Sequence, residues 1–440
     1  GLLFSFGGAG RAVHGRASAF HDSPCPLSAP WPSVRRHSTP AEGGKNVDGH
    51  PTSIEAAPTT APATRQLAVH FTGSGAEYFR IWAVNVLLVL LTLGLYLPLA
   101  KARRLRYVHA NTWVDGEALA FHGDPWRMFR GFLMLAVLAV AYLGAGEFAP
   151  AASAAVLLML YAVWPALWRA SMQYRLANTS WRGLRMGFEG SLHDAYLCFL
   201  PVYVPLTMSA LLDGAMASHG PSTDPALNTG LWGLVSGLAL SLTAPWTLTL
   251  AKRYQHGGYR IADQRLRIRL QARSVYFIGF KSAMLGFFAS LVVMAAGFAL
   301  GSLLGLALNH GAGLAGSSTH VSLMMVLLFG LFYGGVLTPY AATRLQNLTW
   351  SNTRSDGLRF ESSLDGWALV HLTVRNWLLI LLTAGLYRPS ATMATLRLRL
   401  EAIGISVETE PDHWLAPKGV AHADAAGEAA GDFFGMDLGL

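Results

Sequence analysis

Long apolar runs are the feature that most restricts how this chain can fold. A helix needs about 20 residues to cross the hydrocarbon core of a bilayer. Eight apolar segments approach or reach that length, near residues 80–100, 129–148, 150–168, 195–212, 230–250, 283–308, 321–340 and 367–387. Backbone groups cannot stay unpaired in the hydrocarbon, and the alternation of a membrane barrel is absent from these segments. The sequence therefore predicts an all-α, polytopic transmembrane helical bundle.

The proportion of charged residues supports this class. Only 13% of the residues are charged, against about 25% in soluble domains, and the mean hydropathy is +0.35. A deficit of this size indicates an integral membrane protein, and we expect it in the cell inner membrane.

The positive charges fall into alternate connections between the apolar segments. Connections 213–229 and 309–320 hold no Lys or Arg. The basic stretches are 101–130, 169–193, 252–281 and 341–365. This asymmetry follows the positive-inside rule and places the basic stretches in the cytoplasm. It accounts for most of the net charge of +8, so we expect the lipid bilayer and anionic lipid headgroups as partners, and no nucleic acid.

The basic stretches are similar to one another when each is aligned on a proline. Counted from Pro98, Pro165 and Pro245, a tyrosine follows after nine residues in each. Asn-Thr pairs follow at 111–112, 178–179 and 352–353. We interpret these stretches as internal repeats, each a helix that ends at Asn-Thr and continues into a short cytoplasmic hairpin, as in "TWVDGEALAFHG" at 112–123. The tyrosines and arginines are expected to anchor the protein at the interface, with a substrate or headgroup role as the alternative.

One apolar segment occurs twice. "NVLLVLLTLGLYLP" at 85–98 and "NWLLILLTAGLYRP" at 376–389 are identical at ten of fourteen positions. Their length favours two simple spans, which gives eight spanning helices with both termini outside. The basic residues on both sides of each copy support the alternative of two re-entrant elements beside six spans, with both termini inside. A topology reporter at the C-terminus distinguishes the two arrangements.

The polar residues inside these two segments form the candidate solute or lipid site. An interrupted helix pair can mark a binding site, because broken backbone is tolerated in a membrane only where it is buried in protein or faces water. His371 and Arg375 lie one turn apart on the same helical face, and Arg375 comes just before Asn376 of the second copy. The candidate residues are Asn85, Thr92, Gly94, His371, Arg375, Asn376, Thr383 and Gly385.

Residues 91–123, "LTLGLYLPLAKARRLRYVHANTWVDGEALAFHG", resemble the bacterial YjgN family of inner-membrane proteins, a family of unknown function. The resemblance rests on T-x-G-[LI]-Y-x-P, the following A-K-x-R-x-x-R-Y, N-T-x-x-x-G and the closing F-x-G. It extends more weakly over roughly 67–405. The family pattern prefers Trp after the proline, where this chain has Leu99. The resemblance implies a polytopic inner-membrane protein and carries no catalytic residues.

We therefore expect three regions: a disordered leader at 1–66, a transmembrane domain at 67–408 and a flexible tail at 409–440. Common catalytic and nucleotide-binding motifs are missing, so we predict that the protein is not an enzyme and has no cofactor or metal. His109 and His122 lack a third metal ligand, and Cys25 and Cys198 lie in unlike settings. Two functions remain open: a transporter or channel-like protein for a small solute, and a non-catalytic scaffold that binds anionic lipid through its basic repeats.

Overall fold

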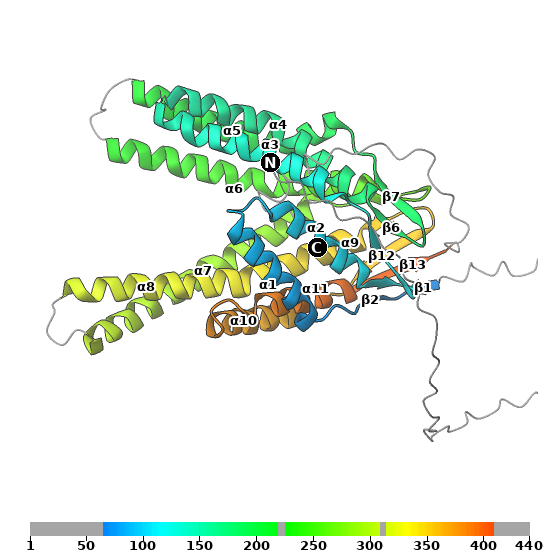
Figure 1. The fold of residues 1–440 in the computed structure, drawn as a ribbon. Helices are drawn as coiled ribbons and strands as arrows, with labels where there is room; N and C mark the ends of the chain where they lie inside the picture. Colours follow the sequence, from blue (N-terminus) through cyan, green and yellow to red (C-terminus); the bar gives the residue numbers. More distant parts are fainter. Residues whose placement is uncertain (1–64, 149, 219–224, 309–313, 409–440) are drawn as a thin grey trace, which may run out of the picture. The chain divides into compact units, whose positions relative to one another are not determined.

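The structure is a computed structural model that describes residues 65–148, 150–218, 225–308 and 314–408. Within these residues the fold is mostly helical, and short strands gather at one end of the long helices (Figure 1). The predicted leader and tail lie outside the described residues, except for Arg65 and Gln66, which belong to the first strand. The first described strand thus begins two residues before the expected start of the transmembrane domain.

Long apolar helices form the first layer. Consecutive helices pack against each other as the pairs α3 with α4, α5 with α6 and α7 with α8. The bounds are α3 Pro125–Phe148, α4 Pro150–Ala177, α5 Leu192–Ser218, α6 Pro225–Gly257, α7 Ala272–Leu308 and α8 Leu314–Phe332. A π-helical turn, η1 Tyr333–Leu337, joins α8 to α9, Thr338–Ser351. Among the described residues, three stretches are long and apolar enough to cross a membrane, at Gly230–Gly257, Ala272–Gly305 and Thr319–Ser351.

The repeated apolar segments belong to two helical hairpins. Helices α1, Gly75–Leu91, and α2, Leu97–Ala110, are joined by a turn at 92–96. Helices α10, Gly366–Leu382, and α11, Arg388–Glu401, are joined by an equivalent turn at 383–387. At about 1.5 Å per residue, α1 is about 25 Å long, which is shorter than the hydrocarbon core of about 30 Å.

Both hairpins begin and end at the strand layer. Strand β2, Val69–Phe71, precedes α1 and pairs with β3, Thr112–Val114, which follows α2. Strand β12, Leu358–Ser362, precedes α10 and pairs with β13, Ile403–Val407, which follows α11. Each repeated segment therefore forms a helical hairpin instead of one straight helix, which supports the re-entrant alternative over a simple span. Segment length was misleading because each apolar run includes the turn and the start of the returning helix.

The short strands correct the expected all-α class. The nine further strands are β1 Arg65–Leu67, β4 Glu117–Ala118, β5 Ala120–Phe121, β6 Thr179–Trp181, β7 Leu184–Phe188, β8 Tyr259–Ile261, β9 Gln264–Arg265, β10 Arg267–Ile268 and β11 Thr353–Arg354. They form three sheets, ordered β1-β13-β12-β11-β10, β2-β3-β4 and β5-β6-β7-β8-β9. Single bent residues connect the sheets: Ala68 between β1 and β2, Leu119 between β4 and β5, and Leu266 between β9 and β10.

These connections make the antiparallel pairings run in a closed circuit, which we call the strand ring. The ring consists of five two-stranded hairpins, and each pairs with the next. Four hairpins are local in sequence, whereas the fifth joins the first and last described strands, with Gln66 opposite Ser406. A two-stranded hairpin alone is marginally stable in water, so closure supplies the partners that each hairpin lacks. The sequence predicted the hairpins as separate cytoplasmic elements.

Buried side chains from all five hairpins pack inside the ring. The core contains Leu67, Val114, Trp181, Ala262, Leu266, Leu358, Phe360, Ile403 and Val407. The turns direct these side chains inward. At Asp115-Gly116 and Arg182-Gly183 both turn residues have positive φ, the conformation of a two-residue type I′ hairpin. Asp115 also accepts ion pairs from Arg65 at 2.8 Å and from Arg182 at 2.7 Å, which connects three neighbouring hairpins.

A helix precedes each hairpin of the ring, and we call α2, α4, α6, α9 and α11 the inner helices. In α2 the final carbonyls accept hydrogen bonds from the Asn-Thr pair: Asn111 Nδ2 donates to Tyr107 O and Thr112 Oγ1 donates to Val108 O, both at 2.8 Å. The pairs at 178–179 and 352–353 repeat these bonds in α4 and α9. They satisfy carbonyls that every helix end leaves unpaired.

The tyrosines that follow each proline by nine residues hold adjacent elements together. Tyr174 Oη donates to Asp124 O at 3.1 Å, and Tyr254 Oη donates to Ser191 O at 2.9 Å. Each carbonyl lies at the exit of the preceding ring hairpin. Arg106 and Arg253 donate to the carbonyls of Gly123 and Leu270, at the exits of their own hairpins. Their polar atoms thus have partners inside the protein, and the expected anchoring at the membrane interface stays a prediction.

Replacing Tyr174 or Tyr254 by phenylalanine tests whether the tyrosine hydroxyl groups hold adjacent elements together. Each of Tyr174→Phe and Tyr254→Phe leaves a carbonyl without its donor, at a cost of about 1 kcal/mol. We expect the unfolding temperature in detergent to fall by about 2–4 °C for each. The control is Tyr340→Phe, because the Tyr340 hydroxyl makes no hydrogen bond within the described residues. An equal fall for the control would contradict the assignment.

Candidate functional site

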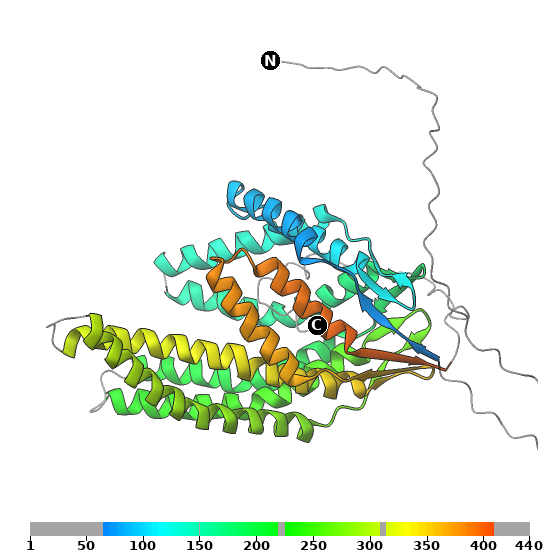
Figure 2. The same cartoon turned by 90° about the horizontal axis from the view of Figure 1, so that it is seen from below.

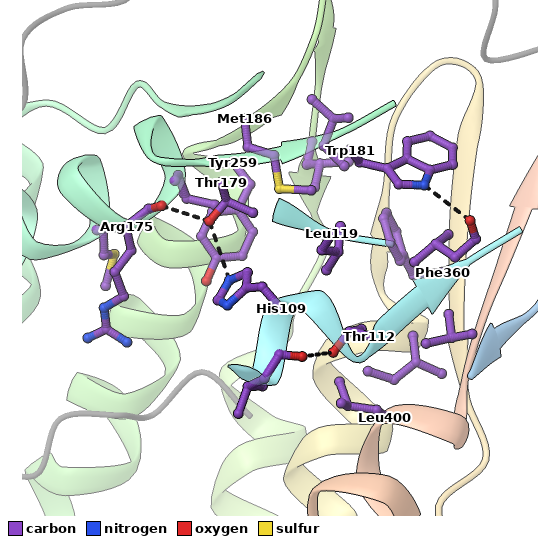
Figure 3. A pocket seen from close by; sticks show the side chains of 18 of the residues that line it. His109, Thr112, Leu119, Arg175, Thr179, Trp181, Met186, Tyr259, Phe360 and Leu400 are labelled. Atoms are coloured by element: carbon purple, nitrogen blue, oxygen red, sulfur yellow. Dashed lines mark hydrogen bonds between the residues drawn. The ribbon is translucent and has the colours of Figure 1, made fainter. Parts of the chain in front are cut away.

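A central cavity of about 410 Å³ lies between the strand ring and the inner helices (Figure 3). Helix α2 and the start of β3 contribute Lys101, Arg104, Leu105, Val108, His109 and Thr112. Helix α4 and the start of β6 contribute Trp168, Ser171, Met172, Arg175, Leu176 and Thr179. Counted from Pro98 and Pro165, the two sets occupy identical positions. Their spacing of three or four residues places each set on one face of its helix.

Most of the cavity wall is apolar. Trp181, Met186, Leu119 and Phe360 project from the strand ring, and Leu400 projects from α11, as Figure 3 shows. Trp181 Nε1 donates to Val114 O at 3.1 Å, so its polar atom is satisfied by the ring and the indole surface is left to face the interior. The cavity can therefore surround an apolar group with aromatic and aliphatic side chains.

The charged side chains that line the cavity are all positive. Lys101, Arg104, Arg175 and Arg260 line it, and no Asp or Glu does so among the described residues. Arg260 forms an ion pair with Glu189. Arg175 Nη2 donates to Ser171 Oγ at 3.2 Å. The cavity is consequently suited to an anion.

A His–Thr contact joins neighbouring inner helices at the cavity wall. His109 Nε2 lies 3.4 Å from Thr179 Oγ1, and His109 Nδ1 lies 2.7 Å from Leu105 O (Figure 3). The same contact recurs between the third and fourth hairpins, where His256 Nδ1 lies 3.1 Å from Thr353 Oγ1. These imidazoles connect one unit of the ring to the next.

A second cavity, which we call the hairpin groove, lies between the α1–α2 hairpin and the start of α11. Its volume is about 510 Å³. Its lining combines an apolar wall with cations: Tyr78, Trp82, Asn85, Val86, Val89, Leu90, Leu97, Ala100, Lys101, Arg104, Arg388, Pro389 and Thr392. Burial raises the pKa of Tyr78, and the charges of Arg104 and Arg388 act in the opposite direction. The positive charges of Arg104 and Arg388 therefore both act on Tyr78, at the same end of the groove.

The predicted asparagines stabilise the two helical hairpins. Asn85 is buried, donates to Ala100 O at 3.5 Å and accepts from Arg103 Nη1 at 3.4 Å. Asn376 is buried and donates to Ala391 O and Thr395 Oγ1, both at 3.4 Å. Each asparagine joins the two helices of its own hairpin. Asn85 also lines the hairpin groove, whereas Asn376 lines neither cavity.

The predicted Thr and Gly residues form the hairpin turns. Thr92 Oγ1 donates to Leu88 O at 2.7 Å and accepts from Tyr96 N at 3.0 Å. Thr383 makes the same two bonds, with Leu379 O and Tyr387 N. Gly94 and Gly385 have φ of +93° and +94°, which favours glycine. These four residues reverse the chain and do not line either cavity.

His371 and Arg375 lie on an exposed face of α10 and line neither cavity. The eight predicted residues are thus not brought together into one site. Along the sequence, the positive-inside rule alone explains the cations that line the cavity. Residues 101, 104 and 108 follow Pro98 at the same distances as residues 168, 171 and 175 follow Pro165. This shared spacing is the signal that could have identified the cavity-lining positions.

The described residues contain no group of three or more His, Cys, Asp or Glu side chains that could hold a metal ion. His109 contacts Thr179, and His122 Nε2 lies 2.8 Å from Ser180 Oγ, so the two imidazoles bond to adjacent residues of β6. Cys198 is a buried free thiol. Cys25 lies outside the described residues.

Comparison with known proteins agrees with the resemblance seen at 91–123. A family described as "Bacterial protein of unknown function (DUF898)" matches residues 66–433. The inner membrane protein YjgN of Salmonella typhimurium strain LT2 is 27% identical over 336 residues, which cover 72% of this chain and 83% of that protein. The inner membrane protein YjgN of Escherichia coli strain K12 is 25% identical over 230 residues, which cover 51% of this chain and 57% of that protein. No solved structure matches the chain.

The relatives and the apolar helices lead to the same conclusion. The relatives are inner membrane proteins by name, and the described residues include helices long and apolar enough to span. Since the family match covers most of its length, the chain belongs to the DUF898 family of bacterial proteins and is a multi-pass protein of the inner membrane.

Proposed function

We propose that this protein is transporter- or channel-like and accepts a small, partly apolar anion in the central cavity. The observation that carries the proposal is the charge of the lining. Four cationic side chains line a mostly apolar cavity, and within the described residues no carboxylate lines it. A charge-assisted hydrogen bond from a guanidinium is stronger than a neutral one, so these groups favour an anion over its neutral analogue.

The proposal places the cavity on the cytoplasmic side. All four basic stretches overlap the strand ring or the ends of the helices that enter it. The positive-inside rule then places the ring in the cytoplasm and the connections 213–229 and 309–320 on the opposite side. The five helix-plus-hairpin units are interpreted as internal repeats whose shared register positions the lining residues around one axis.

The non-catalytic lipid scaffold is less well supported as a general role for the basic stretches. Many of their cations bond within the protein: Arg182 bonds to Asp115, and Arg260 and Arg265 bond to Glu189. Arg106 and Arg253 bond to backbone carbonyls. The hairpin groove still supports binding of lipid at one specific location.

Binding of an aromatic anion tests the central cavity. Benzenesulfonate is permanently ionised, and benzenesulfonamide is its neutral analogue of similar shape. In nanodiscs we expect titration calorimetry to detect benzenesulfonate more strongly than benzenesulfonamide. Arg175→Gln removes one cation, so we expect about tenfold weaker binding of the anion. Arg388→Gln is the control, because Arg388 does not line this cavity. Flux of benzenesulfonate into proteoliposomes, and its loss in Arg175→Gln, tests transport.

Equal binding of the two compounds, or no effect of Arg175→Gln, would exclude the anion site. Anion binding without any protein-dependent flux would reject the transporter or channel class.

Reporter fusions test the orientation. With the ring in the cytoplasm and two re-entrant hairpins, a fluorescent protein at the C-terminus is expected to fold and fluoresce. Alkaline phosphatase inserted within 213–229 is expected to be active. Active phosphatase at the C-terminus would contradict the orientation and support eight simple spans.

A further inference from the structure

The hairpin groove has opposite character at its two ends. Towards the turn at 92–96 its wall consists of Val86, Val89, Leu90 and Leu97. Leu93, within that turn, is 95% exposed, so the tip itself presents an apolar surface. Such a tip is suited to hydrocarbon, and the groove wall beside it is suited to an acyl chain.

Cations from two elements far apart in sequence meet at the other end. Lys101 and Arg104 come from α2, and Arg388 comes from the first residue of α11. Helix α11 packs against α1, which Figure 2 shows as neighbouring orange and blue helices. The guanidinium groups of Arg104 and Arg388 make no hydrogen bond or ion pair with another described residue. No Asp or Glu among the described residues lines the groove.

We propose that the hairpin groove binds an anionic glycerophospholipid, with the phosphate between Arg104 and Arg388 and an acyl chain along Val86, Val89 and Leu90. Guanidinium groups bind phosphate oxygens through strong, directional hydrogen bonds. Trp82 and Tyr78 line the same groove and are residue types that favour the boundary between headgroups and hydrocarbon. A free phosphate would use the cations and leave the apolar wall uncovered, which favours lipid as the occupant.

This inference does not depend on the solute proposed for the central cavity. Lys101 and Arg104 line both cavities, but Arg388 lines the groove and Arg175 lines the central cavity. Each site can therefore be changed without removing a lining residue of the other.

Native mass spectrometry of the full chain tests the site. The probes are phosphatidylglycerol, phosphatidylcholine with the same acyl chains, and inorganic phosphate. One cation near the membrane surface is worth about 1 kcal/mol, so we expect Arg388→Gln to weaken retention of phosphatidylglycerol about fivefold. Arg375→Gln is the matched control: it removes the same charge from an exposed position of α10, outside the groove. It is expected to change retention less than about twofold.

Benzenesulfonate binding by Arg388→Gln reports on folding and on the central cavity. Loss of phosphatidylglycerol with unchanged benzenesulfonate binding supports the lipid site. If no variant or wild-type protein binds benzenesulfonate, the solute proposal fails and the lipid comparison still stands. Four results would overturn the lipid site: equal loss for Arg375→Gln, no loss for Arg388→Gln, equal retention of phosphatidylcholine, or Arg388-dependent binding of inorganic phosphate without phosphatidylglycerol.

Discussion

Closure of the strand ring is the constraint on which the rest of the structure depends. Its strands are two to five residues long, and none of them could form a stable sheet with its own hairpin partner. An open end would expose unpaired backbone groups, which invite association with other chains. Pairing of β1 and β2 with β13 and β3 removes that open end. It also forces both helical hairpins to return to the side from which they start.

The ring explains why chemically useful side chains gather at one place. Helices α2, α4 and α9 enter the ring through the same Asn-Thr helix end, and equivalent positions of α2 and α4 line the same cavity. Lysine and arginine side chains that the positive-inside rule explains along the chain therefore line a common cavity. The two short hairpins add a second recess beside α11, with its own cation and an apolar wall. The helix arrangement thus separates a site suited to solute from one suited to lipid.

Local patterns in the sequence predicted much of this organisation. They could not predict which strands pair when the strands are far apart in the chain. The Asn-Thr pairs indicated the ends of α2, α4 and α9, because a helix end depends on contacts within a few residues. The ring was missed because Gln66 and Ser406 are paired across almost the whole described chain. The predicted site residues lie in separate places: Asn376, Thr92 and Thr383 stabilise hairpins, and Asn85 both stabilises a hairpin and lines the hairpin groove. Arg175 was missed because its role depends on α4 facing α2, which a single helix pattern does not reveal.

A disulfide across the closing strands tests ring closure most directly. In a chain without Cys25 and Cys198, Gln66→Cys with Ser406→Cys places thiols on directly paired residues of β1 and β13. The control pairs Gln66→Cys with Arg359→Cys, two strands away and about 10 Å apart, too far for a disulfide. We expect oxidised membranes to give an intramolecular disulfide, seen as a reducible mobility shift, for the first pair and not for the control. No disulfide in the first pair, or equal cross-linking of both, would contradict a closed ring.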